Sequence, residues 1–245
     1  MSPKAVETEN LTKRYGDVTA LNDLTFDVDE GELFGLLGPN GAGKSTTIEI
    51  LTGQTEPTSG SARVLGTDPS NEPVEARSKL GILPEREDPP SFLTPREYFE
   101  FVGDLRGIES LEERVDDWAE RLGFEGELDT VSMDLSRGQK QKVMFTQAFL
   151  HEPELVLIDE PLTNLDPIIQ ERVKEFVVEY NERGKTVLLS THDITVAEEV
   201  CSRVGIIDGG KLVAERDIDE VTEASSLIDE FLNEVGEGAV EEIKR

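Results

Sequence analysis

A glycine-rich stretch, GPNGAGKST, lies at residues 38–46 between a short apolar run and a helical pattern. It contains the spacing G-x-x-x-x-G-K-S, in which the glycines let backbone N–H groups turn inward around phosphate oxygens. Lys44 is placed to reach the β and γ phosphates of a nucleotide, and the Ser45 hydroxyl to hold Mg²⁺. A glycine-rich turn without a ligand is the alternative, but a strand before the loop and a helix after it are the context that phosphate binding requires. The sequence therefore predicts a phosphate-binding loop made of Gly38, Pro39, Asn40, Gly41, Ala42, Gly43, Lys44, Ser45 and Thr46.

Two adjacent carboxylates end a second apolar run, LVLIDEP at 155–161. Asp159 is placed to reach Mg²⁺ through water, and Glu160 could polarise an attacking water as general base. Two acids that merely end a strand would be ordinary in so acidic a chain, but hydrolysis beside a phosphate loop needs both groups. His192 follows a third apolar run and could donate a hydrogen bond to a γ phosphate. The other histidine, His151, has no such placement, and we predict an ordinary surface residue.

A polar run, DLSRGQKQK at 134–142, precedes the apolar sequence VMFTQAFL. Ser136 can cap a helix, and Gln139, three residues later, can complete a capping box. That structural role would be enough to explain the run. Contact with a ligand is the alternative, and the run alone does not decide between them.

Buried strands alternate with helical segments through most of the chain, which predicts an α/β fold. Short apolar runs bounded by turns predict the strands of a mostly parallel sheet at 33–38, 79–83, 154–159, 186–190 and 203–208. Before them, the segments 6–16 and 21–32 have the pattern of antiparallel strands, and DGGK at 208–211 marks a hairpin turn.

From about residue 92 to 150 the strand signals stop and helical ones take over. Thr94, Pro95 and Glu97 give an N-cap, a proline at the first helical position and a capping box for one helix. We therefore expect a domain over 1–215 with a helical subdomain inserted at about 86–150. The acidic segment 216–245 has apolar residues at largely helical spacing, which predicts one or two amphipathic helices packed on the core.

Composition excludes several classes of protein. A net charge of −29, spread over all 245 residues, would repel nucleic acid, so we expect no nucleic-acid partner. Carboxylates dominate as they do in halophilic proteins, although an ordinary acidic cytosolic protein is the alternative.

No stretch approaches the roughly 20 apolar residues of a membrane span, and the N-terminus lacks the apolar core of a signal peptide. The single cysteine, Cys201, is expected to be a small buried residue of a protein made for a reducing compartment.

Taken in order, GPNGAGKST, LSRGQ, LVLIDEP, NLDP and STHD resemble the motifs of the ATP-binding subunit of an ATP-binding cassette (ABC) transporter, over roughly residues 5–215. The resemblance implies a P-loop NTPase fold with a mostly parallel core sheet, an antiparallel β subdomain and an inserted α-helical subdomain. It implies ATP and Mg²⁺ as ligands, with Tyr15 stacked on adenine. It also implies two partners, a second ATPase subunit, most simply an identical one, and an integral-membrane permease. The chain would then be cytoplasmic and peripheral on the inner face of the cell membrane.

The resemblance gives the LSRGQ loop a role in a dimer. In that family the LSGGQ-like signature of one subunit closes over ATP held by the phosphate loop of the other, so a second helix N-terminus faces the γ phosphate. Asp166, in NLDP, would lie at the dimer seam. The signature residues that would act in trans are Ser136, Arg137, Gly138 and Gln139.

Two positions depart from the family pattern. Glu85, in GILPE, stands where glutamine is usual, in the loop that contacts Mg²⁺ and couples to the membrane partner, and a carboxylate can still ligate Mg²⁺. This LPE sequence resembles the exporter branch related to drug and sodium extrusion. Arg137 replaces the first signature glycine; it could touch phosphate in trans or face solvent, and we expect it to face solvent.

A soluble ABC-type ATPase of DNA repair or translation is the main alternative function. A repair ATPase would separate its phosphate loop and signature by a long coiled coil, whereas Lys44 and Ser136 are only 92 positions apart. A translation factor would usually carry two cassettes in one chain. A nucleotide-binding regulator without turnover would be expected to lack Glu160 or His192, and both are present.

Overall fold

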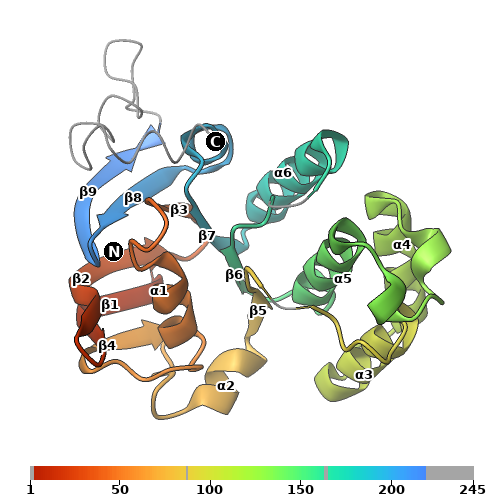
Figure 1. Ribbon diagram of the computed structural model, residues 1–245, viewed down its shortest axis with the longest axis horizontal. Coiled ribbons are helices and arrows are strands. Elements are labelled where there is room, and N and C mark those ends of the chain that lie inside the picture. The colour runs from red at the N-terminus through yellow and green to blue at the C-terminus, as the bar shows by residue number, and fades with distance from the viewer. Residues whose placement is uncertain (1–2, 87, 163–164, 219–245) are drawn as a thin grey trace.

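A six-stranded sheet of order β5-β6-β7-β3-β8-β9 runs through the middle of the molecule (Figure 1). The computed structural model describes residues 3–86, 88–162 and 165–218. The strands from β5 to β8 are parallel, and β9 returns antiparallel to β8, so the prediction of a mostly parallel core sheet is confirmed. The six strands are β3 (Leu33–Leu37), β5 (Leu80–Leu83), β6 (Leu155–Asp159), β7 (Thr186–Thr191), β8 (Arg203–Asp208) and β9 (Lys211–Asp217).

Both faces of this sheet are covered, which is why its strands read as continuous apolar runs. Along β6, Val156 and Ile158 belong to one hydrophobic cluster, and Leu155 and Leu157 to another, because successive side chains of a strand point to opposite faces. Helices α5, α6 and α7 pack on the first cluster, and α1 packs on the second. The helices of the described part are α1 (Lys44–Leu51), α2 (Pro73–Ser78), α3 (Pro95–Arg106), α4 (Leu111–Leu122), α5 (Arg137–Phe149), α6 (Pro167–Glu182) and α7 (Ile194–Val200).

A second, three-stranded sheet is antiparallel and has the order β2-β1-β4. It confirms the antiparallel strands expected before the parallel sheet and adds β4, which we did not predict. Only Ala62 and Val64 of β4 are buried, and the residues before them are SGS. This apolar pattern is too short to predict a strand. The three strands are β1 (Lys4–Tyr15), β2 (Val18–Asp29) and β4 (Ser59–Val64).

The region between β5 and β6 is helical in the part of it that the structure describes, and it projects to one side of the sheet (Figure 1). Helix α3 begins at the predicted capping box, in which Thr94 accepts from the Glu97 backbone N–H and Glu97 accepts from Thr94. Helix α5 begins at the second predicted box, formed by Ser136 and Gln139. Two short 3₁₀ turns, Glu125–Glu127 and Ser132–Asp134, connect α4 to α5.

The end of the described chain extends slightly beyond the predicted domain limit. The hairpin at 208–211 is confirmed, and β9 continues to Asp217. Ile218 packs against the core, and the rest of the predicted amphipathic segment, 219–245, lies outside the described residues. Cys201 is buried, as expected, and burial raises the pKa of its thiol. Among the described helices, none has the length and hydropathy needed to cross a bilayer.

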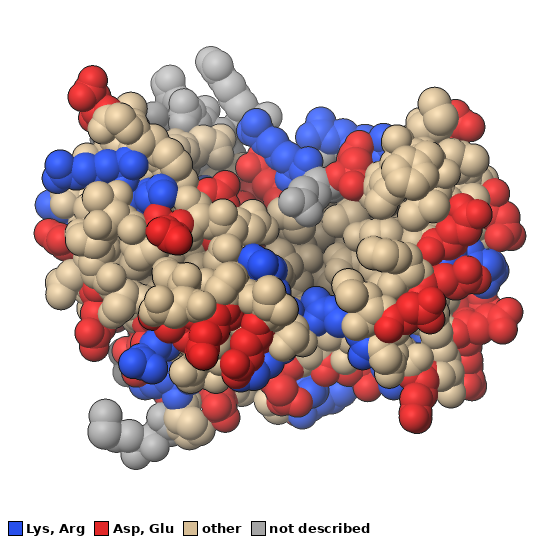
Figure 2. All heavy atoms as spheres, turned by 90° about the horizontal axis from the view of Figure 1, so that it is seen from below, with Lys and Arg blue, Asp and Glu red and all other residues tan. Residues whose placement is uncertain are grey.

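On the face seen in Figure 2, acidic side chains are distributed over the surface instead of being gathered in one patch. Figure 2 shows Asp and Glu scattered over one face of the molecule, with Lys and Arg between them. On this face the acidic residues are therefore not confined to one element. Such a surface repels itself, and salt screens that repulsion.

Candidate nucleotide-binding site

The glycine-rich loop connects the end of β3 to the start of α1, as predicted. Close packing explains two of its glycines: a Cβ on Gly38 would lie 2.3 Å from the carbonyl oxygen of Ile207, and one on Gly43 would lie 2.8 Å from that of Ala20. Gly43 is also the N-cap of α1 and has a φ of 114°, in the region that favours glycine. The loop therefore brings backbone N–H groups and the positive end of α1 to the same place, where an anion is favoured.

Lys44 reaches back over this loop. Its Nζ donates hydrogen bonds to the carbonyl oxygens of Gly38, at 2.7 Å, and Pro39, at 3.2 Å, and its side chain is only 6% exposed. Burial lowers the pKa of Lys44, and the nearby carboxylates of Glu160 and Asp159 oppose that shift. A nucleotide phosphate would add further negative charge beside this ammonium group, so Lys44 is positioned to bind one.

Asp159 is a buried carboxylate at the end of β6. The Ser190 hydroxyl donates a hydrogen bond to Asp159 Oδ1 from the neighbouring strand β7. Burial raises the pKa of Asp159, while hydrogen bonds from Ser190 and Ser45 lower it. A buried anion beside a serine hydroxyl fits a magnesium ion, which in nucleotide sites takes one or two carboxylates and completes its shell with water and phosphate.

The described residues contain no cluster of three or more His, Cys, Asp or Glu with the geometry of a metal site. The negative charge of Glu85 also acts on the Asp159 carboxylate, so the third predicted metal residue faces the same region. Sequence analysis did not identify Ser190, although its place at the end of the strand that precedes His192 was a usable signal.

Glu160 lies between two cationic or protonatable groups. Its Oε1 is 2.8 Å from Nδ1 of His192 and 3.5 Å from Nζ of Lys44, and its side chain is 11% exposed. The hydrogen bond to Glu160 raises the pKa of His192. Glu160 has a φ of 52°, which is uncommon for a residue with a side chain, and such positions cluster at functional sites. The fold thus fixes the direction of this carboxylate.

A cavity of about 440 Å³ is centred on the phosphate loop. Tyr15 lies at its rim with 47% of its surface exposed, and its hydroxyl donates to Glu49 at 3.3 Å. Lys13 Nζ is 4.9 Å from the centre of the Tyr15 ring. Val18, at the start of β2, also lines the cavity and is 66% exposed, although sequence analysis did not select it. The lining residues are Tyr15, Val18, Thr19, Ala20, Asn40, Gly41, Gly43, Lys44, Ser45, Thr46, Glu85, Arg86 and Glu160.

The residues expected to act in trans lie away from this cavity. Ser136 begins α5 and is exposed, and Arg137 beside it is exposed too. Arg137 lines a separate cavity of about 400 Å³ together with Glu85. Asp166 caps α6, and its Oδ1 accepts from the backbone N–H groups of Ile168 and Ile169, both at 3.1 Å. None of these three lines the cavity at the phosphate loop of its own chain in the described structure.

His151 contradicts the prediction of an ordinary surface residue. Its Nε2 lies 3.0 Å from the carbonyl oxygen of Leu80 at the start of β5, and its Nδ1 is buried without a partner among the described residues. Burial, with a further contribution from Arg106, lowers the pKa of His151 to about 4. Its position between α5 and β6 could not be read from the run FLHEPEL, because the burial comes from β5 and α3, which are distant in the sequence.

The fold and the site define a P-loop nucleotide hydrolase of the cassette type, and comparison with known proteins agrees. The family model described as ABC transporter matches residues 21–163, and the chain belongs to this family. It is an ATP-binding and ATP-hydrolysing subunit of an ABC transporter.

Several relatives carry the same assignment. The chain is 36% identical over 231 residues to an uncharacterized ABC transporter ATP-binding protein of Methanocaldococcus jannaschii, covering 94% of this chain and 83% of that one. It is 36% identical over 220 residues to the Nod factor export ATP-binding protein I of Rhizobium johnstonii, covering 88% and 70%. It is 35% identical over 236 residues to a bacitracin transport ATP-binding protein of Enterococcus faecalis, covering 96% and 76%.

Solved structures share the fold. The structure of an ATP-binding subunit of an ABC transporter aligns with a TM-score of 0.84 and 31% identity, covering 98% of this chain and all of that one, 100%. A dimeric ATP-binding cassette in a post-hydrolysis state, bound to ADP and Pi, aligns with a TM-score of 0.80 and 27% identity, covering 87% and 98%.

Proposed function

We propose that two copies of this chain close over two ATP molecules and drive a separate membrane permease in the direction of export. Each ATP would lie between the phosphate loop of one copy and the segment Ser136–Gln139 of the other. Hydrolysis would reopen the dimer. A dimeric cassette bound to ADP and Pi supports the dimer, and a relative named for Nod factor export supports an export role. Binding to the permease would hold the subunit at the inner face of the membrane.

The placement of Glu160 carries this proposal. Its carboxylate is held by His192 on one side and by Lys44 on the other, so it points into the space above the phosphate loop, where water would attack the γ phosphate. Glu160 would accept the proton of that water, and His192, through its hydrogen bond, would keep the carboxylate in position. The Lys44 ammonium group would stabilise charge on the β and γ phosphates.

Three residues would hold the magnesium ion that such a site implies. Ser45 and Asp159 would be its closest protein partners, with Glu85 facing it from the loop after β5. When bound, Mg²⁺ would neutralise charge on the phosphate oxygens. In the absence of nucleotide, the buried Asp159 carboxylate is stabilised by Ser190 and Ser45, whose hydrogen bonds lower its pKa.

Replacing Glu160 by glutamine tests this assignment. Glu160→Gln keeps the shape and the hydrogen-bonding capacity of the side chain but removes the base, so we expect ATP to bind and hydrolysis to fall by about 10²- to 10⁴-fold. Size-exclusion chromatography should show a dimer that persists with ATP. Glu154→Gln is the matched control, since Glu154 lies just before β6, at the end opposite Asp159, with its side chain 72% exposed.

A Glu160→Gln protein with near-normal turnover would contradict the assignment of the base. The permease partner is tested separately, by purifying the tagged protein from membranes of its own organism. We expect an integral-membrane protein to co-purify in stoichiometric amount. Recovery of the protein free of membrane partners, with ribosomes or DNA-repair proteins in their place, would contradict the transport role.

A further inference from the structure

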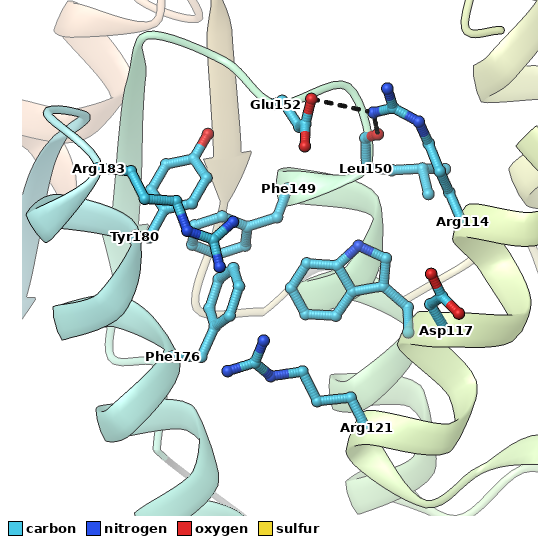
Figure 3. A pocket seen from close by; sticks show the side chains of 10 residues that line it. Arg114, Asp117, Arg121, Phe149, Leu150, Glu152, Phe176, Tyr180 and Arg183 are labelled. Atoms are coloured by element: carbon cyan, nitrogen blue, oxygen red, sulfur yellow. Dashed lines mark hydrogen bonds and ion pairs between the residues drawn. The ribbon is translucent and has the colours of Figure 1, made fainter. Parts of the chain in front are cut away.

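Another cavity, of about 310 Å³, lies between α4 of the helical region and α6 of the core, next to the end of α5 (Figure 3). It shares no lining residue with the cavity at the phosphate loop. Four residues of α4 contribute to it, at positions 114, 117, 118 and 121, which fall on one helical face. Positions 176, 180 and 183, on α6 and at its end, face them. The end of α5 and the residues after it close the cavity.

The floor of this cavity is aromatic. Trp118 packs edge-on against Phe176, with ring centroids 4.6 Å apart, and lies 6.0 Å from Phe149. Tyr180 packs against Phe149 at 5.0 Å. Trp118 is only half-buried, whereas the other three rings are at most 3% exposed. The half-buried indole is thus the ring that a ligand can contact.

Arginines gather at the rim of the cavity although the protein is strongly acidic. Three guanidinium groups and two carboxylates line it, from Arg114, Arg121, Arg183, Asp117 and Glu152. Figure 3 shows the side chains of Arg183, Arg121 and Arg114 approaching the cavity from different sides.

Two of the three arginines already have partners. Arg114 is paired with Glu152 at 3.3 Å. Arg121 is paired with Glu179 at 2.5 Å and lies 4.5 Å above the Phe176 ring. Arg183 is exposed, and its guanidinium makes no hydrogen bond or ion pair with any residue that the structure describes, which leaves this planar group available to an anion.

We propose that this cavity binds a small aromatic carboxylate. The ring would lie against Trp118, and the carboxylate would take a two-point hydrogen bond from Arg183, whose guanidinium has no carboxylate partner of its own. The volume is at the lower end of the roughly 300–1,000 Å³ of small-molecule sites, so one or two rings fit better than a nucleotide. Such a ligand contacts both the helical region and the core. This site does not depend on the proposed transport function.

The single tryptophan of the chain makes the site directly observable, because Trp118 is the only residue of its type. Sodium benzoate titrated into the full-length protein should change Trp118 fluorescence saturably. Benzamide, which keeps the ring, and acetate, which keeps the charge, should each fail to do so over the same range, with ionic strength held constant by sodium chloride. Arg183→Gln should weaken benzoate binding by about tenfold, the loss expected for one charge-assisted contact.

The control variant is Arg63→Gln, which removes an exposed arginine from β4, outside both cavities. It should bind benzoate like the wild type, and both variants should bind ATP normally, which shows that they fold. Three results would each overturn the proposal: no saturable change with benzoate, equal binding of benzamide, or unchanged binding by Arg183→Gln. A matching response to inorganic phosphate would overturn the aromatic specificity.

Discussion

At the scale of single residues, the chemistry depends on the Glu160 carboxylate and on the two side chains that contact it. Glu160 is held by His192 and Lys44, and all three are at least partly buried. Mutual stabilisation of opposite charges offsets the cost of placing them out of water. The shift in the pKa of His192 is the measurable sign of this arrangement.

The pH dependence of stability should report the contact between His192 and Glu160. The contact raises the pKa of His192 in the folded state, so its contribution is fully present below the ordinary histidine pKa, about 6.5, and is lost as pH rises through the raised value. We expect the stability difference between wild type and His192→Gln to be largest at the acidic end of this range. Denaturant unfolding of both proteins at a series of pH values measures it.

Wild type and His192→Gln contain the same other titratable groups. Taking the difference between their stabilities therefore removes the contribution of those groups to the pH dependence. Thr195→Gln is the control, because Thr195 is exposed near the start of α7, close to His192 in the sequence, and the substitution does not change the charge. A stability difference that does not vary with pH would show that the protonated form of His192 gains nothing from Glu160.

At the scale of elements, two helices begin with the same capping box but in different places. Thr94 and Glu97 begin α3, and Ser136 and Gln139 begin α5. The box at α5 also makes a bridge, since the Gln139 amide donates to Glu127 at 2.8 Å. The local structure therefore does not show whether Ser136 and Gln139 only cap a helix or also contact the ATP of a second subunit. A functional comparison of α3 and α5 distinguishes these two roles.

Exchanging each cap for arginine separates the two roles. Ser136→Arg and Thr94→Arg should each cost about 1 kcal/mol of stability, because each removes an N-cap. Only Ser136→Arg should block ATP-dependent dimerisation and hydrolysis, since it places a bulky side chain where the second subunit's ATP would lie. The measurement is sizing with ATP in the Glu160→Gln background, where slow turnover does not hide the dimer.

ATP binding to the single subunit tests the other half of the sandwich model. Ser136→Arg should leave ATP affinity at low protein concentration nearly unchanged, whereas Lys44→Ala should weaken it, since Lys44 lies over the phosphate loop. A Ser136→Arg protein that still dimerises with ATP would contradict the sandwich model. So would one that loses ATP binding as severely as Lys44→Ala.

At the scale of the whole molecule, net charge governs the response to salt. With a charge of −29 spread over the surface, repulsion between carboxylates opposes the compact state, and added salt screens it. Ion pairs at the surface weaken in salt as well, but each contributes little. We therefore expect the melting temperature to rise from dilute buffer to molar KCl, as measured by calorimetry.

The salt response tests our proposal that the protein comes from a halophile. Sorbitol at matched osmolality serves as the uncharged control, because it changes water activity without screening charge. A melting temperature that is constant or falls with KCl would refute the proposal and leave the ATPase assignment intact.

The sequence by itself determined the features that depend on neighbours within a few positions. Both capping boxes and the hairpin at 208–211 follow from interactions between residues a few positions apart, and the phosphate loop is identified by the spacing of residues within 38–46. The buried strands follow from apolar runs for the same reason. Strand β4 shows where local prediction ends. Its apolar pattern is weak, and it is a strand because it pairs with β1.

Only the tertiary structure decided how these pieces meet. Glu160, His192 and Lys44 come together because β6, β7 and β3 are consecutive in the sheet, an order that no local signal specifies. His151 is half-buried and lies within hydrogen-bonding distance of Leu80 in β5, and the aromatic cavity needs α4 and α6 to pack across α5. Each depends on contacts between segments that are far apart in the chain, so their side-chain partners and pKa shifts exist only after the helices and sheet have packed.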